Sequence, residues 1–286
     1  MIATINYPGF KGSHRRPRVR KACIPRGVSL FLACFLGTFS WEVSLPGEPG
    51  NGASEIPGSF GLRAQKRFME DQNQFQSQPG NPEMALKFGL AAFDWAEFAT
   101  NSHQREAIAL AGIDACRSVV AGQPKSAAGH YYLAMNLGQL ARTKTLGALK
   151  LVDEMETEFQ ITRKLDEDFD YAGPDRNLGL LYSEAPGWPT SIGSRGKARH
   201  HLCRAVVLKP NYPENRLNLL EAYLKWGDKS GANQEFRTLK ELWPTAKNEF
   251  TGELWEMSWT DWDRRWEKIQ IKFPVDKVVE SPRNQK

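Results

Sequence analysis

Several features that mark common protein classes are scarce in this sequence of 286 residues. It has only four cysteines, of which Cys23 and Cys34 lie in the first 40 residues, leaving Cys116 and Cys203 for the body of the chain. Two cysteines are too few for a disulfide framework, and since both fall in apolar helical patterns we expect buried thiols. No apolar stretch reaches the roughly 20 residues that a membrane-spanning helix needs.

Signatures of catalysis and metal binding are also missing. The sequence contains no Gly-x-Ser-x-Gly and no His-Glu-x-x-His. His200 and His201 are neighbours on a predicted helix, so they point about 100° apart and cannot hold one metal ion together. The acidic run 166–170 lacks the glycine and the glutamate of a calcium loop, and we interpret it as a solvated turn. We therefore predict no enzymatic activity, no cofactor and no metal site.

Acidic residues are absent from the first part of the chain. Residues 1–26 hold seven of the 38 basic residues and no acid, so the remaining 31 basic residues face 33 acidic ones, although the whole chain has a net charge of +5. A near-neutral body lacks the basic surface that nucleic-acid binding requires. We expect no nucleic-acid partner.

A short apolar stretch, residues 28–39, follows the basic residues. A basic leader, about a dozen apolar residues and then small residues such as Thr38 and Ser40 are typical of a secretory signal peptide. We predict that residues 1–40 are a signal peptide with a long basic leader and that the protein is exported, to the periplasm or out of the cell. A lipoprotein anchored through Cys34 is the alternative. No transmembrane helix would remain in the mature chain.

The rest of the chain changes composition once more. Residues 41–82 are rich in Gly, Pro, Ser, Asn and Gln, which predicts a flexible linker in which only Phe60 to Phe75 has helical spacing. Beyond it, apolar residues recur every three or four positions almost to Phe273, which indicates an all-α body. The predicted helices cover 83–99, 103–121, 126–144, 147–166, 173–184, 195–208, 213–226, 229–242 and 251–271. Residues 274–286 are expected to be a disordered tail.

The helices occur in pairs that repeat. Asn136, Asn177 and Asn218 each stand before a leucine in the first helix of a pair, 41 residues apart. The second helices repeat at 34 residues, since Ala198, Leu202, Ala205 and Pro210 are followed by Ala232, Phe236, Leu239 and Pro244. The bare unit is therefore 34 residues long, and the third pair carries an insertion of seven residues.

This unit resembles the tetratricopeptide repeat (TPR). The third pair matches best, with Leu178-Gly179, Tyr182, Ala198, Ala205 and Pro210, and the fourth keeps Tyr223, Ala232, Phe236 and Pro244. The second pair keeps Leu137-Gly138, and the first keeps little beyond Ala107 and Pro124. The resemblance implies a right-handed α-solenoid of about four helix-turn-helix repeats over residues 83–250, with a concave face lined by the first helices.

The TPR resemblance also implies a binding site. Asn136, Asn177 and Asn218 match the position, two residues before the repeat glycine, that faces the groove in the family and in some members binds a peptide main chain. An amide suits this role because it both donates and accepts hydrogen bonds without charge. Asn is also common there regardless of ligand, which leaves a structural role open. The neighbours predicted to share the groove are Met135, Gln139, Arg142, Arg176 and Glu221.

The insertion of the third repeat contributes a further candidate, Trp188. The segment 184–193 contains Pro186, Gly187, Pro189 and Gly193, which exclude a helix. Insertions in repeat proteins often carry binding, so Trp188 could contact a partner. Alternatively, its side chain folds back and fills the gap between two repeats.

Tryptophans are concentrated near the C-terminus. Trp255, Trp259, Trp262 and Trp266 continue with Ile269 and Phe273 as one stripe of a helix over 251–273. A capping helix that covers the last repeat explains the stripe. Homo-oligomerisation or partner docking through the tryptophans, and contact with a membrane surface, are the alternatives. Thr260 could also start a separate helix and divide the stripe.

A second, shorter resemblance concerns the third repeat. The segments Leu-Gly-Leu-Leu-Tyr, Pro-Gly-Trp-Pro-x-Ser-Ile-Gly and Lys-Ala-x-x-His-Leu-x-x-Ala-Val, all between 178 and 206, are similar to the T-component proteins of tripartite ATP-independent periplasmic (TRAP) transporters. That resemblance implies an oligomeric transport accessory with an apolar ligand cavity. We predict first an exported TPR-type scaffold that binds a peptide or a partner protein, with the transport accessory as the alternative.

Overall fold

The computed structural model describes residues 58–144 and 147–273, and this part of the chain is helical, without β-strands. The predicted signal peptide, with Cys23 and Cys34, the first part of the predicted linker and the predicted tail lie outside the described residues. The elements are α1 (Gly58–Ser77), α2 (Pro82–Ala96), α3 (Ser102–Gly122), α4 (Ala127–Ala141), α5 (Ala148–Leu165), α6 (Phe169–Glu184), α7 (Arg195–Leu208), α8 (Pro213–Lys225), α9 (Lys229–Glu249), a 3-10 turn η1 (Glu253–Trp255) and α10 (Glu256–Gln270).

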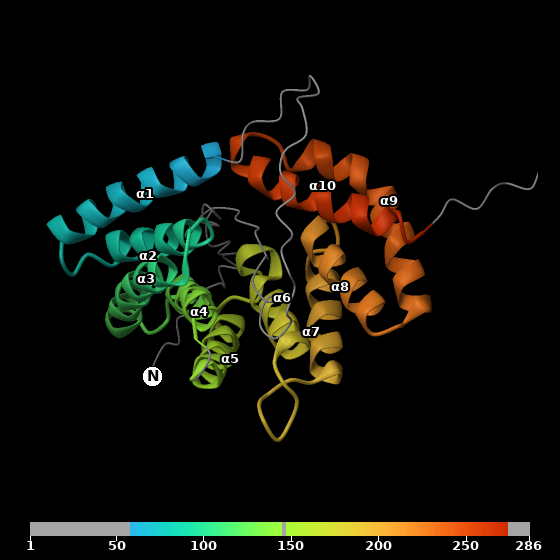
Figure 1. The fold of residues 1–286 in the computed structure, drawn as a ribbon, viewed down its shortest axis with the longest axis horizontal. Helices are drawn as coiled ribbons and strands as arrows, with labels where there is room; N and C mark the ends of the chain where they lie inside the picture. The colour runs from blue at the N-terminus through green and yellow to red at the C-terminus, as the bar shows by residue number, and fades with distance from the viewer. Residues whose placement is uncertain (1–57, 145–146, 274–286) are drawn as a thin grey trace, which may run out of the picture.

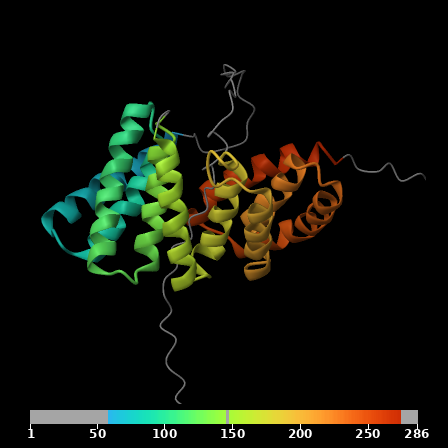
Figure 2. The same cartoon turned by 90° about the horizontal axis from the view of Figure 1, so that it is seen from below.

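The helices pack in consecutive antiparallel pairs, α2 with α3, α4 with α5, α6 with α7 and α8 with α9. Figures 1 and 2 show these pairs following one another around an arc, with α1 before the first pair and α10 packed on the last pair. The predicted all-α solenoid of helix-turn-helix repeats is confirmed. Several helices start where the sequence provides a capping side chain, namely Asn81, Asn101, Ser126, Ser194 and Asp228.

Small residues bring the paired helices close together. A Cβ atom on Gly112 of α3 would lie 2.3 Å from the Asn136 Oδ1 atom and 2.8 Å from the Ala92 Cβ atom. In the third pair, a Cβ atom on Gly179 would lie 2.6 Å from the Leu202 Cγ atom. These contacts explain why glycine stands where helices of one repeat and of adjacent repeats meet.

Helix α1 lies within the segment that was predicted to be a flexible linker. The stretch 41–82 was expected to be flexible, but within it residues 58–77 form α1, which packs on α2. The reason is the apolar spacing already visible there: the rings of Phe68 and Phe75 lie 5.2 and 5.6 Å from the ring of Phe88. Burial of these rings offsets the cost of ordering the helix.

The two ends of the described chain meet through an ionic contact. The Arg63 guanidinium of α1 lies 3.0 Å from the Glu253 carboxylate and 3.1 Å from that of Glu256. Figure 1 shows α1 approaching α10 accordingly. Because the side chains are exposed, each pair contributes at most about 1 kcal/mol.

The tryptophan-rich segment is a cap. Trp262 is 1% exposed and packs on the rings of Tyr212 and Trp255 at 5.4 and 5.8 Å. Trp266 stacks on Trp243 of α9, at 5.2 Å between ring centroids. Three of the four tryptophans, Trp255, Trp262 and Trp266, are thus buried within the chain itself, so these three do not form the exposed surface that docking would need.

Two boundaries near the cap differ from the prediction. Helix α9 was expected to end at 242, but it continues through Pro244 to Glu249, because Trp243, Ala246 and Phe250 pack in the same apolar cluster as the cap. Thr260 does not start a new helix, since it lies inside α10 and its hydroxyl donates to the Glu256 carbonyl at 2.8 Å. The stripe is therefore continuous along α10.

The close approach at Gly112 makes a first prediction. Gly112→Ala should lower the free energy of unfolding by about 1–3 kcal/mol, because the new methyl group would overlap buried Asn136 and Ala92. Gly122→Ala in the same helix is the matched control, since a Cβ there meets nothing within 4 Å, and it should leave stability unchanged or raise it by up to about 1 kcal/mol. Urea unfolding measures both, and equal effects would contradict this packing.

The cap makes a second prediction. Trp262→Ala should lower the free energy of unfolding by about 3–5 kcal/mol, because it removes a fully buried ring from the aromatic cluster. Trp188→Ala, at a position that is 89% exposed, should change it by less than about 0.5 kcal/mol. Thermal unfolding compares the two variants. A small effect at Trp262 would show that α10 is not part of the cooperative core.

Candidate partner-binding site

The first predicted groove residue, Asn136, is buried rather than available to a ligand. Its side chain is fully buried, and its amide Nδ2 donates to the carbonyls of Gly89 and Tyr132, both at 2.8 Å. Gly89 belongs to α2, so the amide joins the first helices of adjacent repeats. It also approaches Cys116, where burial raises the pKa of the thiol to about 12 and leaves it unreactive.

Asn177 and Asn218 occupy equivalent interior positions. Asn177 is 4% exposed and donates to the Tyr131 hydroxyl at 2.9 Å. Asn218 is 2% exposed and accepts a hydrogen bond of 2.5 Å from Arg265 of the cap. In each case the partner belongs to a neighbouring repeat or to the capping helix. The three amides thus bind groups of the chain itself, which is the structural role left open by the sequence, and the asparagine ladder for a peptide main chain stays a prediction.

The predicted groove neighbours have internal partners as well. Buried Met135 contacts the Asn177 amide through its sulfur at 3.6 Å. The Glu97 carboxylate binds both the Gln139 amide, at 2.6 Å, and the Arg142 guanidinium, at 3.0 Å. Glu221 binds Arg265 through two hydrogen bonds of 3.0 and 2.7 Å. These four residues join repeats and cap, although 41% of the Glu221 side chain stays exposed.

Arg176 lies at the centre of a buried polar cluster. It is 2% exposed, and its Nη2 atom lies 2.5 Å from the Asp170 Oδ2 atom, which also accepts from the Tyr131 hydroxyl at 2.5 Å. Its Nη1 atom donates to the Asp170 and Tyr171 carbonyls at 3.0 and 3.3 Å. It also donates to the Asn215 Oδ1 atom of α8 at 3.3 Å. One guanidinium thus connects α4, α6 and α8.

The carbonyls that Arg176 binds belong to a left-handed turn. Asp170, Tyr171 and Ala172 have φ angles of 47°, 54° and 63°. Such a conformation costs roughly 1–2 kcal/mol for each residue with a side chain and persists only where surrounding contacts enforce it. Here Asn215 also donates to the Tyr171 carbonyl, at 3.0 Å. The regular part of α6 begins after this turn, at Gly173, as the sequence predicted.

The acidic run 166–170 was interpreted as a solvated turn, but its last residue, Asp170, is buried. Its side chain is 4% exposed, whereas Glu167 and Asp168 are exposed. Burial raises its pKa, against the opposing effect of the Arg176 charge. The sequence offered little signal for this, because Tyr and Ala rarely adopt positive φ, and nothing in the run marks the one buried acid.

Trp188 is the most exposed of the predicted site residues. It is 89% exposed, so the alternative in which it fills the gap between repeats is wrong. Ile192 of the same loop is partly buried and packs against the core of the first three repeats. Figure 1 shows the loop projecting beyond the ends of α6 and α7.

The base of this loop is ordered by backbone hydrogen bonds. The Gly193 N–H donates to the Pro186 carbonyl at 2.8 Å, and the Ser194 N–H donates to that of Tyr182 at 2.9 Å. Glycine is needed at 193, since a Cβ there would lie 2.0 Å from the Ala185 carbonyl oxygen. The loop therefore presents the indole from a base that is fixed by hydrogen bonds.

Basic side chains lie beside the loop base. The guanidinium groups of Arg195 and Arg199 lie 5.4 and 5.7 Å from the ring centre of Trp226, within the range of cation–π contacts. Lys197 lies 4.7 Å from the ring centre of Tyr182. Arg199 also pairs with Asp228 at 2.7 Å. The base of the loop accordingly carries aromatic rings and basic groups, of which Lys197 lies 3.7 Å from the Glu156 carboxylate.

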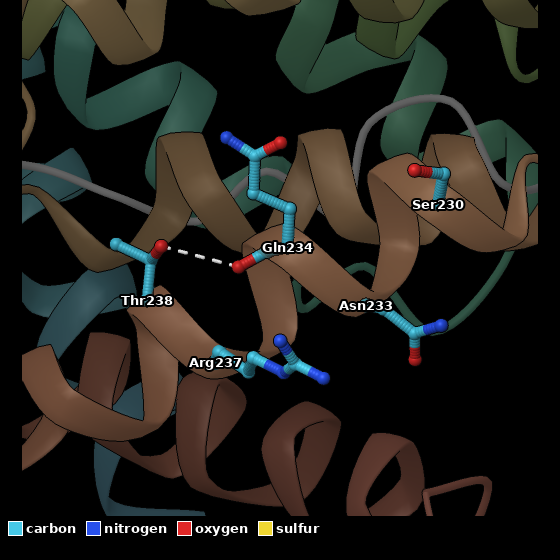
Figure 3. Close-up of a pocket in the computed structure, with 5 residues that line it drawn as sticks. All are labelled: Ser230, Asn233, Gln234, Arg237 and Thr238. Atoms are coloured by element: carbon cyan, nitrogen blue, oxygen red, sulfur yellow. Dashed lines mark hydrogen bonds between the residues drawn. The ribbon is translucent and has the colours of Figure 1, made fainter.

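A surface pocket elsewhere offers no catalytic chemistry. Its lining residues all come from α9, as Figure 3 shows: Ser230, Asn233, Gln234, Arg237 and Thr238. They follow helical spacing on one face, and the Thr238 hydroxyl donates to the Gln234 carbonyl at 3.1 Å. No general base accompanies the two hydroxyls in this lining. Within the described ranges, no three His, Cys, Asp or Glu side chains are grouped as metal ligands.

The two cysteines of the helical repeats differ in burial. Cys116 is buried as expected, whereas Cys203 is only partly buried and lies 3.5 Å from the Tyr223 hydroxyl. Among the helices of residues 58–144 and 147–273, none combines the length and the apolar character needed to cross a bilayer.

Comparisons with known proteins support the fold. Neither a protein-family model nor a curated protein matches the sequence. The crystal structure of a thermophilic TPR protein of Thermus thermophilus is similar, with a TM-score of 0.54 and 17% sequence identity over 73% of this chain and 92% of that chain. At this identity the likeness shows the fold alone: the chain is a solenoid of TPR-like repeats. The resemblance to transporter T-components stays a prediction.

The buried cluster makes a third prediction. Arg176→Met should lower the free energy of unfolding by about 3–5 kcal/mol, because it leaves the Asp170 charge buried without its partner. Arg199→Met, which removes a half-exposed arginine paired with Asp228, should cost less than about 1 kcal/mol. Chemical unfolding of both variants measures the difference. Similar losses would show that the cluster does not hold the repeats together.

Proposed function

We propose that this protein is a non-enzymatic repeat scaffold that binds a partner protein through the loop 185–194, with Trp188 as the anchor. The observation that carries the proposal is the 89% exposure of an indole on a loop whose base is fixed by hydrogen bonds. An exposed tryptophan that enters a partner's pocket can contribute about 2 kcal/mol or more, and tryptophan is enriched among such anchors.

The surroundings of the loop favour a partner of particular chemistry. Arg195 and Lys197 are exposed at the base of the loop, where Arg195 stacks on Trp226 and Lys197 lies 3.7 Å from the Glu156 carboxylate. A complementary surface would carry an apolar pocket with carboxylates on its rim, since charge complementarity steers association and excludes other partners. Export is part of the proposal, supported by the basic leader and the apolar stretch of residues 28–39. Cell fractionation would test it, and full-length protein in the cytoplasm would contradict it.

The partner proposal makes a fourth prediction. A photo-crosslinking amino acid at position 188 of the full chain, expressed in its own cells, should yield a discrete cross-linked product that mass spectrometry identifies. The same probe at Val207, which is 77% exposed on α7, is the matched control and should not yield that product. Trp188→Ala should reduce co-purification of the identified partner at least about tenfold, the loss of one anchor of about 1.4 kcal/mol or more.

The outcomes separate binding from folding. The thermal unfolding of Trp188→Ala should match that of the unmodified protein, so that lost binding reflects the missing side chain. Equal cross-linking from positions 188 and 207, or co-purification that is unchanged in Trp188→Ala, would contradict the proposal.

A transport accessory of the T-component kind is the second candidate. It is favoured by one observation: the three segments that resemble this family form a single hairpin of α6, the loop and α7. Leu202 packs against Gly179, and Tyr182 lies over His201 with ring centres 5.5 Å apart. In this case the co-purified partner should be a substrate-binding subunit of a transporter, and light scattering should show an oligomer.

A further inference from the structure

Helices α1 and α10 belong to opposite ends of the arc of repeats, and they meet. Figure 1 shows the beginning of α1 beside the cap, so that the two helices together close the arc. In a solenoid each repeat contacts mainly its neighbours. The contact between Arg63 and Glu253 is of another kind, because it joins residues 190 positions apart in the sequence.

Helix α1 is firmly attached to the first repeat. The rings of Phe68 and Phe75 pack on Phe88 of α2, with ring centroids 5.2 and 5.6 Å apart. Closer to the beginning of α1, a Cβ atom on Gly61 would lie 3.3 Å from the Phe98 ring. Since these contacts extend along the helix, α1 moves together with the first repeat.

The acidic residues that α1 meets are attached to the last repeat. Trp255 lies between Glu253 and Glu256 in the sequence and is 6% exposed. Its ring packs on those of Tyr212 and Phe250, with centroids 6.1 and 4.7 Å apart. A change in the distance from α1 to these two carboxylates therefore reports a movement of one end of the solenoid relative to the other.

The contact between the two ends is ionic. The Arg63 guanidinium lies 3.0 Å from the Glu253 carboxylate and 3.1 Å from that of Glu256. The neighbouring Leu62 and Leu254 are 68% and 61% exposed, so these two apolar side chains do not seal the contact. An exposed ion pair shifts an equilibrium by no more than about fivefold, and dissolved salt screens it.

We propose that Arg63, Glu253 and Glu256 form an electrostatic clasp that holds the two ends of the solenoid together, and that rising ionic strength opens it. The curvature of a solenoid is the sum of small rotations between successive repeats, so the ends can separate without the unfolding of any repeat. Opening of the clasp widens the concave face and makes the first helices more accessible. The inference does not depend on the loop 185–194 or on the partner proposed for it.

The fifth prediction tests the clasp by a distance between spin labels in the full chain. Labels on encoded amino acids at Met69 of α1 and at Ile271, which follows α10, occupy positions that are 51% and 81% exposed. Pulsed electron resonance should show one short distance at about 0.01 M salt. A longer component should appear at about 1 M, where the Debye length has fallen from about 30 Å to about 3 Å.

Reversal of the charge on α1 should open the clasp without added salt. Arg63→Glu should raise the ratio of long to short distances at about 0.01 M salt by at least about fivefold, because attraction to two carboxylates becomes repulsion. Exchange of the charges, by adding Glu253→Arg and Glu256→Arg to Arg63→Glu, should restore the short distance. Circular dichroism should show the same helix content in all variants, since the three side chains are partly or fully exposed.

Arg117→Glu is the matched control. Arg117 is 53% exposed and pairs with Glu154 at 2.8 Å, but this pair joins α3 to α5 and not the ends of the solenoid, so the label distance should stay the same. An unchanged distance in Arg63→Glu, or an equal change in Arg117→Glu, would overturn the proposal. Failure of the exchanged charges to restore the short distance, or a distance insensitive to salt in the unmodified protein, would overturn it as well.

Discussion

The guanidinium of Arg176 is the interaction on which the middle of the solenoid depends. It neutralises Asp170, binds the carbonyls of the left-handed turn that leads into α6, and reaches Asn215 of the next repeat. A TPR-like solenoid is stabilised mainly by contacts between neighbouring repeats. At this junction much of that contact is polar, so it fixes the relative position of three repeats through directed hydrogen bonds as well as through apolar area.

The fold was predictable because the helical signal is local and repeated. Apolar spacing, capping residues and the 34-residue recurrence of Ala198 and Ala232 placed most helices within a few residues of their observed ends. The errors came where a distant partner decides the outcome. Helix α1 forms inside a polar segment because Phe88 of the next helix receives its rings, and α9 passes Pro244 because the cap packs against it.

The site was less predictable because a residue type does not reveal its partner. Asparagine at 136, 177 and 218 has the chemistry to bind a peptide main chain, but the same donors and acceptor bind groups of the neighbouring repeats and cap. Whether an amide faces a ligand or an adjacent helix depends on the distance between helices, which glycines such as Gly112 make small. The position of Trp188 was ambiguous because the sequence does not show which apolar side chain of the loop packs on the repeats. In the structure Ile192 packs there and Trp188 is exposed.

These two results divide the molecule by role. The polar side chains predicted to line the groove join repeats, and changing them is expected to alter stability before it alters recognition. In the insertion between α6 and α7, Ile192 packs against the repeats, whereas residues 187–190 at the tip are exposed. The tip can therefore vary without disturbing the repeats. An exposed indole on an ordered loop does not gain the free energy that burial of a tryptophan side chain normally provides. Burial in a partner molecule would regain that free energy, which is why we propose the insertion, rather than the solenoid interior, as the binding site.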